Sequence, residues 1–321
     1  MRVAAIMLLF AATALGQNNR AADQVYLPVA AHAGTYATDA WVTNWSSDPV
    51  SISVQFIPQN VAPVPVELRD AFKLRPHERK EVNDLLGTLK ISSAGQVVFN
   101  ACRDGADCRG ELAPAMANYR IISVESRTYS GGLGQDLPAI PWDKTATDRD
   151  TLQISGIRSS GQWRTNIGLV NASEFSSAYF VLRLYDGASV AQRDQQVIRL
   201  GPLESRQQNV ASLFPKLGEW NRLNRTRAAT NAFVTITESG VTPTADAAAN
   251  GCPNGCPAFV AYGSLIDNAS GDPTTLEAQY VPPEEGTVQA YKMAANAPTD
   301  PPCAYRPDCV LAMIRVGDAI R

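Results

Sequence analysis

The sequence predicts an all-β protein made of two tandem immunoglobulin-like β-sandwich domains, with short helical crossovers and a loop-rich C-terminal extension. Three observations lead to this fold class. Apolar and polar residues alternate with a period of two in many short segments, turn-forming residues separate those segments, and one phrase of the sequence occurs twice. Long helical periodicity is rare, so strands are the main elements that we expect.

Strand-like alternation occurs in both halves of the chain. The segment "VSISVQF" (50–56) has an apolar residue at every second position, which is typical of a strand with one buried and one solvated face. "WRTNIGLVN" (163–171) alternates in the same way, and "FVLRLY" (180–185) is a more continuous apolar run rich in strand formers. Several such strands with turns between them favour a sandwich of immunoglobulin-like size in each half.

The chain contains an internal repeat. "YATDAWVTNWS" (36–46) and "WRTNIGLVNAS" (163–173) share a threonine, an asparagine and a serine at matching places. "LRPHE" (74–78) and "LGPLE" (200–204) then follow at nearly the same spacing. Matching phrases in the same order over so long a stretch indicate a duplicated domain, because the units of a solenoid are much shorter.

The repeat sets the domain boundaries that we expect. Short helical turns are predicted at 83–89 and 209–217, which are corresponding places in the two halves. The polar segment "PWDKTATDRD" (141–150) reads as a linker. The predicted divisions are a signal peptide at 1–16, a first β-sandwich domain at 24–145, a second one at 150–280 that duplicates it, and a Pro-rich C-terminal extension at 281–321.

The N-terminal segment "MRVAAIMLLFAATALGQ" has the features of a secretory signal peptide. Arg2 supplies a positive start, an apolar stretch follows, and Ala14 and Gly16 are the small residues of a cleavage site. The apolar stretch is too short to span a bilayer as a helix, and no later segment is apolar for long enough either. We therefore expect a secreted or periplasmic protein with no membrane span in the mature chain.

Six cysteines fit an oxidising compartment. They fall into three local pairs, each enclosing turn-forming residues, and this arrangement favours short disulfide-closed loops. A structural zinc site built from two of the pairs is the alternative, although the spacings are loose for one. The predicted pairs are Cys102 with Cys108, Cys252 with Cys256, and Cys303 with Cys309.

Composition excludes some classes of partner. The formal net charge is −3 and the sequence pI is near 5.5, so the basic surface of a nucleic-acid binder is not expected. No Gly-rich phosphate loop follows a strand, and the Asp-rich turns at 103–107 and 267–275 do not match the spacing of an EF-hand. The sequence therefore predicts no cofactor and no metal ion.

Few residues are suited to catalysis. The chain has two histidines, of which His32 reads as a polar residue at a strand end and His77 as a packing residue, since Leu203 takes its place in the repeat. No Gly-x-Ser-x-Gly elbow is present. Paired carboxylates of a glycoside hydrolase remain an alternative, because sequence does not give the distance between carboxyl groups. Candidate carboxylates are Glu125, Asp267 and Asp272.

Several phrases of the chain are distinctive when taken together. They are "VYLPVAAHAGTYATDAWVTNWSSDPVSISVQF", "RTNIGLVN", "GQDLPAI" and "AYGSLIDNASGDPTT". In this combination the chain resembles secreted bacterial proteins with tandem immunoglobulin-like β-sandwich modules, over most of residues 25–280. The resemblance implies that fold and export. It brings no catalytic residues that could be assigned to positions of this sequence.

These observations predict an exported, non-enzymatic interaction or structural protein with a protein or glycan partner at the cell surface. Trp41 and Trp45 are the candidate binding residues, because the second copy of the phrase has Gly168 and Ala172 in their places. The cysteine-closed loops are further candidates, since sandwich loops often bind. The alternative is a carbohydrate-active enzyme, or its accessory binding protein, with carboxylates in an interdomain cleft. A two-domain periplasmic chaperone is a third hypothesis, by fold analogy only.

Overall fold

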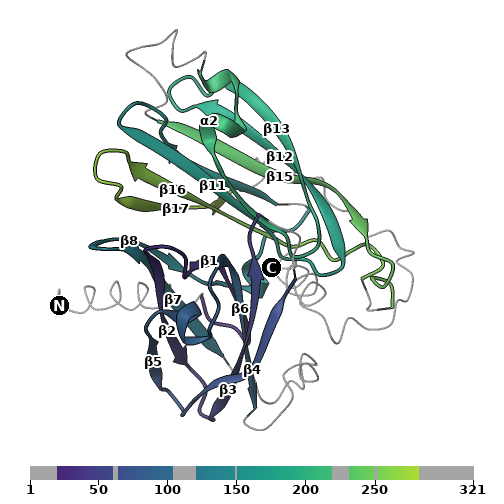
Figure 1. The fold of residues 1–321 in the computed structure, drawn as a ribbon. Helices are drawn as coiled ribbons and strands as arrows, with labels where there is room; N and C mark the ends of the chain where they lie inside the picture. Colours follow the sequence, from purple (N-terminus) through teal and green to yellow (C-terminus); the bar gives the residue numbers. More distant parts are fainter. Residues whose placement is uncertain are drawn as a thin grey trace, which may run out of the picture.

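The computed structural model of the protein describes residues 20–60, 64–103, 121–148, 150–218, 231–249 and 252–281. Figure 1 shows this part of the chain as strands joined by turns, with only short helices. The all-β part of the predicted fold class is confirmed. The predicted signal peptide (1–16) and all but the first residue of the predicted C-terminal extension (281–321) lie outside the described residues.

The strands of the first half form two antiparallel sheets. Sheet A has the order β5-β2-β7-β8, and sheet B has the order β4-β3-β6-β1-β9. The elements are β1 (Gln24–Ala31), β2 (Tyr36–Asn44), β3 (Val50–Pro58), β4 (Val66–Leu74), β5 (Arg79–Val82), α1 (Leu85–Thr88), β6 (Ala94–Arg103), β7 (Ile122–Ser130), β8 (Leu133–Pro138), β9 (Ile140–Pro141) and the 3-10 helix η2 (Trp142–Lys144).

The second half forms two more antiparallel sheets. Sheet C has the order β14-β11-β16-β17, and sheet D has the order β13-β12-β15-β10-β18. The elements are β10 (Thr151–Ile157), β11 (Trp163–Asn171), β12 (Ser176–Asp186), β13 (Gln192–Leu200), β14 (Ser205–Asn209), α2 (Val210–Leu213), β15 (Ala232–Pro243), β16 (Phe259–Asp267), β17 (Pro273–Glu277) and β18 (Gln279–Tyr280).

The predicted arrangement of the sheets, as two tandem immunoglobulin-like β-sandwich domains, is wrong. The four sheets are arranged as the four blades of a β-propeller. Alternation reports that a strand has one buried face, but it does not report which other sheets surround that strand. Sheet C contacts both sheet A and strand β1, so the two halves share an interface.

The two halves repeat one topology. Sheets A and C have the same strand order when β5 is matched with β14, β2 with β11, β7 with β16 and β8 with β17, and sheets B and D match in the same manner. Helices α1 and α2 stand at the same step of this order. Each is a single turn, capped by Asp84 or Asn209, and lies within the segments 83–89 and 209–217 where short helical turns are predicted.

The alternating sequence of β2 shows how the core is built. Ala40 and Val42 are buried because they point to the inner face, and Trp41 between them is more exposed. They join side chains of sheet B, such as Phe56 and Phe99, in the apolar core of the first half. One member of this core, Tyr262, comes from β16 of the second half. The core of the first half is therefore completed by the second half.

The repeated asparagine forms the same turn in both halves. Nδ2 of Asn44 donates to the carbonyls of Asp48 and Arg75 at 2.8 and 2.9 Å, and its Oδ1 accepts from the N–H of Ser46 at 2.9 Å. Asn171, at the end of β11, makes three corresponding hydrogen bonds. Both asparagines are fully buried, so the shared phrase is a structural element. The corresponding partners of Asn171 are Ser176, Gly201 and Ser173.

The second repeated phrase also folds in the same way twice. His77 and Leu203 occupy matching positions, and each has a φ of 56°, which is unusual for residues other than glycine. Glu78 and Glu204 follow them, and each carboxylate accepts from a backbone N–H three residues earlier at 2.7 Å. This hydrogen bond lowers the pKa of Glu78. His77 is exposed, however, whereas Leu203 is buried, so His77 is not the packing residue that the repeat predicted.

The two halves meet along β8 and β17, which lie next to each other in Figure 1. Ser264 donates from Oγ to Oε1 of Gln135 at 2.7 Å, and Thr275 donates from Oγ1 to the carbonyl of Asp136. These bonds cross from sheet C to sheet A. The junction is thus fixed by directed polar contacts as well as by buried apolar surface.

A second contact joins the outer face of sheet B to the turn before β14. Leu203 packs against Ile57 and Val98 in a small buried cluster. Beside it, the N–H of Asn60 donates to the carbonyl of Ser205 at 2.9 Å. Each half therefore covers part of the other at two separate places.

Candidate functional site

The two predicted binding residues lie on the outer face of sheet A. Trp41 is half-buried and stands directly opposite Glu81 of β5 and Glu125 of β7, so the three side chains share this face. Trp45 follows the end of β2, and 52% of it is exposed. Its Nε1 donates to Oγ of Ser123 at 2.9 Å. The indole of Trp45 is therefore presented to solvent in a fixed orientation.

Charged side chains surround the tryptophans. Arg79 of β5 forms an ion pair with Glu125 of β7, with 2.8 Å between Nη2 and Oε2, and both side chains are exposed. Glu81 is exposed on the same face. We call the surface formed by Trp41, Trp45, Arg79, Glu81 and Glu125 the tryptophan face. It combines apolar rings with hydrogen-bond donors and acceptors that are open to solvent.

The second half uses the equivalent face for a different purpose. Gly168 stands where the first half has Trp41, and the ring of Tyr262 on the neighbouring strand lies over it. Tyr262 is buried at the junction with the first half. Ala172, which replaces Trp45, is also buried. The tryptophans of the first half thus lie on a face that is open to solvent, whereas the residues that replace them in the second half, Gly168 and Ala172, are buried.

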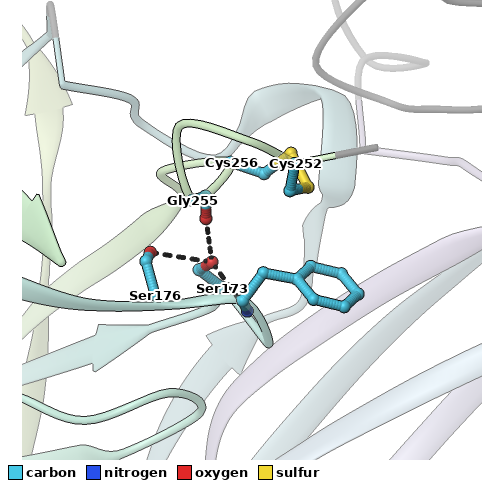
Figure 2. The surroundings of a disulfide bond; sticks show 6 residues. Ser173, Ser176, Cys252, Gly255 and Cys256 are labelled. Carbon is cyan, nitrogen blue, oxygen red and sulfur yellow. Dashed lines mark hydrogen bonds between the residues drawn. A yellow bond between two sulfur atoms is a disulfide. The ribbon is translucent and has the colours of Figure 1, made fainter. Parts of the chain in front are cut away.

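The cysteine-closed loop of the second half has a structural setting. Cys252 and Cys256 form a disulfide, as predicted, with 5.1 Å between their Cα atoms. Figure 2 shows the loop beside Ser173, whose hydroxyl donates to the carbonyl of Gly255 at 2.7 Å and accepts from Oγ of Ser176 at 3.0 Å. Because Ser173 belongs to the repeated phrase, the loop is tied to the buried asparagine turn.

The other predicted disulfides lie partly or wholly outside the described residues. Cys102 is buried near the end of β6, and its predicted partner, Cys108, lies beyond the described part of that segment. Cys303 and Cys309 are outside the described ranges as well. These two pairings therefore stay predictions.

A polar group that the sequence did not indicate lies between the end of β1 and the start of α1. Nδ1 of His32 lies 2.9 Å from the carboxylate of Asp84, and both side chains are partly exposed. Asp39 accepts from the N–H of Asp84 at 2.8 Å and from the hydroxyl of Tyr129 at 3.3 Å. The charge of Asp39 raises the pKa of Tyr129. Gly87 leaves the space that lets His32 reach Asp84.

The second half has a neutral version of this group. Asn166 replaces Asp39, and it accepts a hydrogen bond of 3.4 Å from Asn209, which caps α2 as Asp84 caps α1. The change from Asp39 to Asn166 was the one signal of this group in the aligned phrases. His32 follows the end of β1, as predicted. Its partner Asp84 is far away in the sequence, so the spacing of residues does not reveal the contact.

The three candidate carboxylates of the glycosidase alternative serve separate local roles. Glu125 is paired with Arg79 on the tryptophan face. Asp267 accepts from the N–H groups of Ala269 and Ser270 in the hairpin between β16 and β17. Asp272, in the same hairpin, accepts at its backbone carbonyl from the N–H of Asp267. Local hydrogen bonding of this kind is what turn-forming aspartates provide.

One carboxylate that sequence analysis missed is Glu238. It is buried on the core face of β15, directly opposite Phe180, and neither of its side-chain oxygens has a hydrogen-bond partner in the described part of the chain. Burial, followed by the charge of Asp148, raises the pKa of Glu238 to about 8. At the matching position of β6 the first half has Ala101. A burial pattern inferred from alternation does not distinguish this glutamate from a solvated one.

The described residues contain no group of three or more His, Cys, Asp or Glu side chains placed to hold a metal ion. Within the same ranges, no helix has the length and apolar character needed to cross a membrane.

Comparison with known proteins assigns no family to the chain. No protein-family model matches the chain, and no curated protein sequence matches it either. The resemblance to secreted bacterial proteins with tandem modules therefore stays an expectation, and its sandwich architecture is replaced by the propeller arrangement described above.

Proposed function

We propose that this chain is an exported, non-enzymatic interaction protein that binds a cell-surface glycan through its tryptophan face. The observation that carries the proposal is the exposed indole of Trp45, held in place by its hydrogen bond to Ser123. A large aromatic ring that is already ordered loses little conformational entropy on binding. Tryptophan is also the residue that most often dominates the energy of a binding surface.

The chemistry around Trp45 favours a glycan over an apolar partner. Sugars present hydroxyl groups beside apolar C–H faces, so they need hydrogen-bonding groups next to aromatic rings. Arg79 supplies donors, and Glu81 and Glu125 supply acceptors, on the same face as Trp41. A flat sheet face with this composition suits an extended chain of sugars more than a closed pocket would.

The proposal of a non-enzymatic role rests on the separation of the carboxylates. Glu125, in sheet A, is paired with Arg79, whereas Asp267, in sheet C, accepts backbone hydrogen bonds in a hairpin. Glycoside hydrolysis needs two carboxyl groups on opposite sides of one bond. Binding a glycan does not need two paired carboxyl groups, since single exposed polar groups around an aromatic ring are sufficient.

The test is a binding assay with purified cell-wall polysaccharides immobilised on a surface. We expect the wild-type protein to bind and Trp45→Ala to lose at least tenfold in affinity, with a smaller loss for Trp41→Ala because it is half-buried. Trp163→Ala is the matched control, since Trp163 lies at the start of β11 in the second half and contacts Arg158 instead. Equal binding by wild type and Trp45→Ala would exclude the tryptophan face as the site. Retention of a protein partner, with no glycan bound, would exclude the glycan.

A further inference from the structure

The outer face of sheet A, which includes the tryptophan face, carries more negative than positive charge. Residues directly opposite each other on paired antiparallel strands point to the same face of a sheet. The pairings within sheet A place four carboxylates and two guanidinium groups on the face of Trp41, so negative charges exceed positive ones by two. All six side chains are exposed or half-buried. The carboxylates are Asp39, Glu81, Glu125 and Asp136, and the guanidinium groups are Arg79 and Arg127.

Ion pairing neutralises only part of this negative charge. Arg79 is paired with Glu125, with 2.8 Å between Nη2 and Oε2. Glu81 and Asp136 are also exposed, and neither forms an ion pair with a residue that the structure describes. Carboxylate groups are therefore available on this face for a positively charged partner.

The second half shows that the fold does not require these charges. The strand pairings of sheet C give the residue that stands at each of the six positions in the duplicate, and all six residues are uncharged. The charged set therefore belongs to the face that stays open to solvent beside the tryptophans. The residues at these positions of the second half are Asn166, Gln207, Tyr262 and Thr275 for the carboxylates, and Ser205 and Ser264 for the arginines.

An ammonium group suits the surroundings of Trp41 in two ways. The face of an indole ring attracts cations. Glu81 of β5 and Glu125 of β7 stand on either side of Trp41, and carboxylates accept strong, charge-assisted hydrogen bonds from ammonium groups. The same carboxylates would repel the acidic groups of an anionic polysaccharide. The charge of the face thus favours a cationic sugar chain.

We propose that the glycan bound by the tryptophan face carries free amino groups, as a chain of glucosamine units does. The indoles of Trp41 and Trp45 pack against the sugar rings, and Glu81 and Glu125 hold the ammonium groups. This inference rests on the proposed function and adds the charge of the glycan to it.

The experiment compares a hexamer of glucosamine with a hexamer of N-acetylglucosamine of the same linkage. N-acetylation removes the positive charge of each unit and keeps the sugar ring. Binding to the full chain is measured by isothermal titration calorimetry at pH 5.5. At low ionic strength we expect the glucosamine hexamer to bind about tenfold more tightly, as a few exposed charge pairs would give. The difference should shrink as salt is added, because salt screens exposed charges.

Three variants assign the preference to this face. Glu81→Gln removes one charge at a position where the second half has Gln207, and it should weaken binding of the glucosamine hexamer about two- to fivefold while the other hexamer is unaffected. Trp45→Ala should weaken binding of both hexamers. Asp70→Asn is the control, since Asp70 is an exposed carboxylate of β4 in sheet B, and asparagine tolerates its φ of 46°.

The outcomes separate this inference from the proposed function. Equal binding of both hexamers, weakened by Trp45→Ala, would overturn the inference and support the proposed function. A preference for the glucosamine hexamer that Glu81→Gln leaves unchanged, or that Asp70→Asn lowers as much, would also overturn the inference alone. A preference that survives Trp45→Ala with undiminished affinity would overturn both, because the glycan would then bind elsewhere.

Discussion

Asn44 and Asn171 hold the two halves of the chain in the same way, each through two donated hydrogen bonds and one accepted one. Both side chains are fully buried. Removing one of them deletes two hydrogen bonds to backbone carbonyls and one from a backbone N–H. The first prediction follows from this relationship.

Asn171→Ala should lower the free energy of unfolding by about 2–4 kcal/mol, because several buried polar groups lose their partners at once. Asn44→Ala should have a similar effect. Urea-induced unfolding monitored by circular dichroism measures both changes. Ser47→Ala, an exposed position in the same turn as Asn44, is the control and should stay within about 0.5 kcal/mol of the wild type. A small effect of both asparagine variants would contradict the structural role of the turn.

Because the pKa of Glu238 is raised in the folded protein, we expect the free energy of unfolding to depend on pH. Its pKa is about 8 in the folded protein and near 4.5 in the unfolded chain. Between these values the folded state holds a proton that the unfolded state has released, so this group's contribution to stability is complete below pH 4.5 and falls as pH rises toward 8. The loss is on the order of a few kcal/mol.

Glu238→Gln should remove this dependence and make the protein more stable than the wild type at pH 8. Unfolding curves at pH 5, 6.5 and 8 for both proteins provide the comparison. If the wild type and Glu238→Gln keep the same difference in stability at all three pH values, the side chain does not titrate in this range.

Gly168→Ala should destabilise the protein by about 1–3 kcal/mol, since the added methyl group would overlap the ring of Tyr262 and force it to move. Gly161→Ala is the matched control, because a Cβ at Gly161 meets nothing within 4 Å. Thermal unfolding of both variants gives the values. In a double-mutant cycle with Tyr262→Leu, the cost of Gly168→Ala should largely disappear. Additive effects would show that the clash is not the cause.

Loss of the disulfide between Cys252 and Cys256 should have a modest and local effect. A loop this short removes little conformational entropy from the unfolded chain, which corresponds to about 2 kcal/mol of stability on the chain-entropy model. The double variant with serine at both positions should remain folded, with faster amide hydrogen exchange near Ser173 and unchanged exchange in sheet A. Global unfolding of the variant would mean that the loop does more than close a turn.

Much of the secondary structure follows from local patterns. Alternation in β2 places Ala40 and Val42 inside, and the repeated phrase marks Asn44 and Asn171 as equivalent. These features depend on neighbours along the chain and on the period of a strand, so the sequence alone contains them.

The arrangement of the sheets could not be predicted, because it depends on which surfaces of distant segments meet. Tyr262 belongs to a segment of strand-forming residues, and its burial by the first half depends on residues far from it in the sequence. Glu238 lies within β15 on the core face, where a charged side chain is not expected. The glycine that replaces Trp41 suggested a lost binding residue, whereas it makes room for Tyr262.

The position of Tyr262 also bears on how the protein is made. A ribosome synthesises the chain from its N-terminus, so sheets A and B can pair while β16 has not yet been translated. The core that they enclose lacks one of its aromatic rings until Tyr262 emerges. The first half therefore stays incomplete from the end of its own synthesis until residue 262 is added, and a chain that stops before residue 262 leaves apolar surface of that half uncovered.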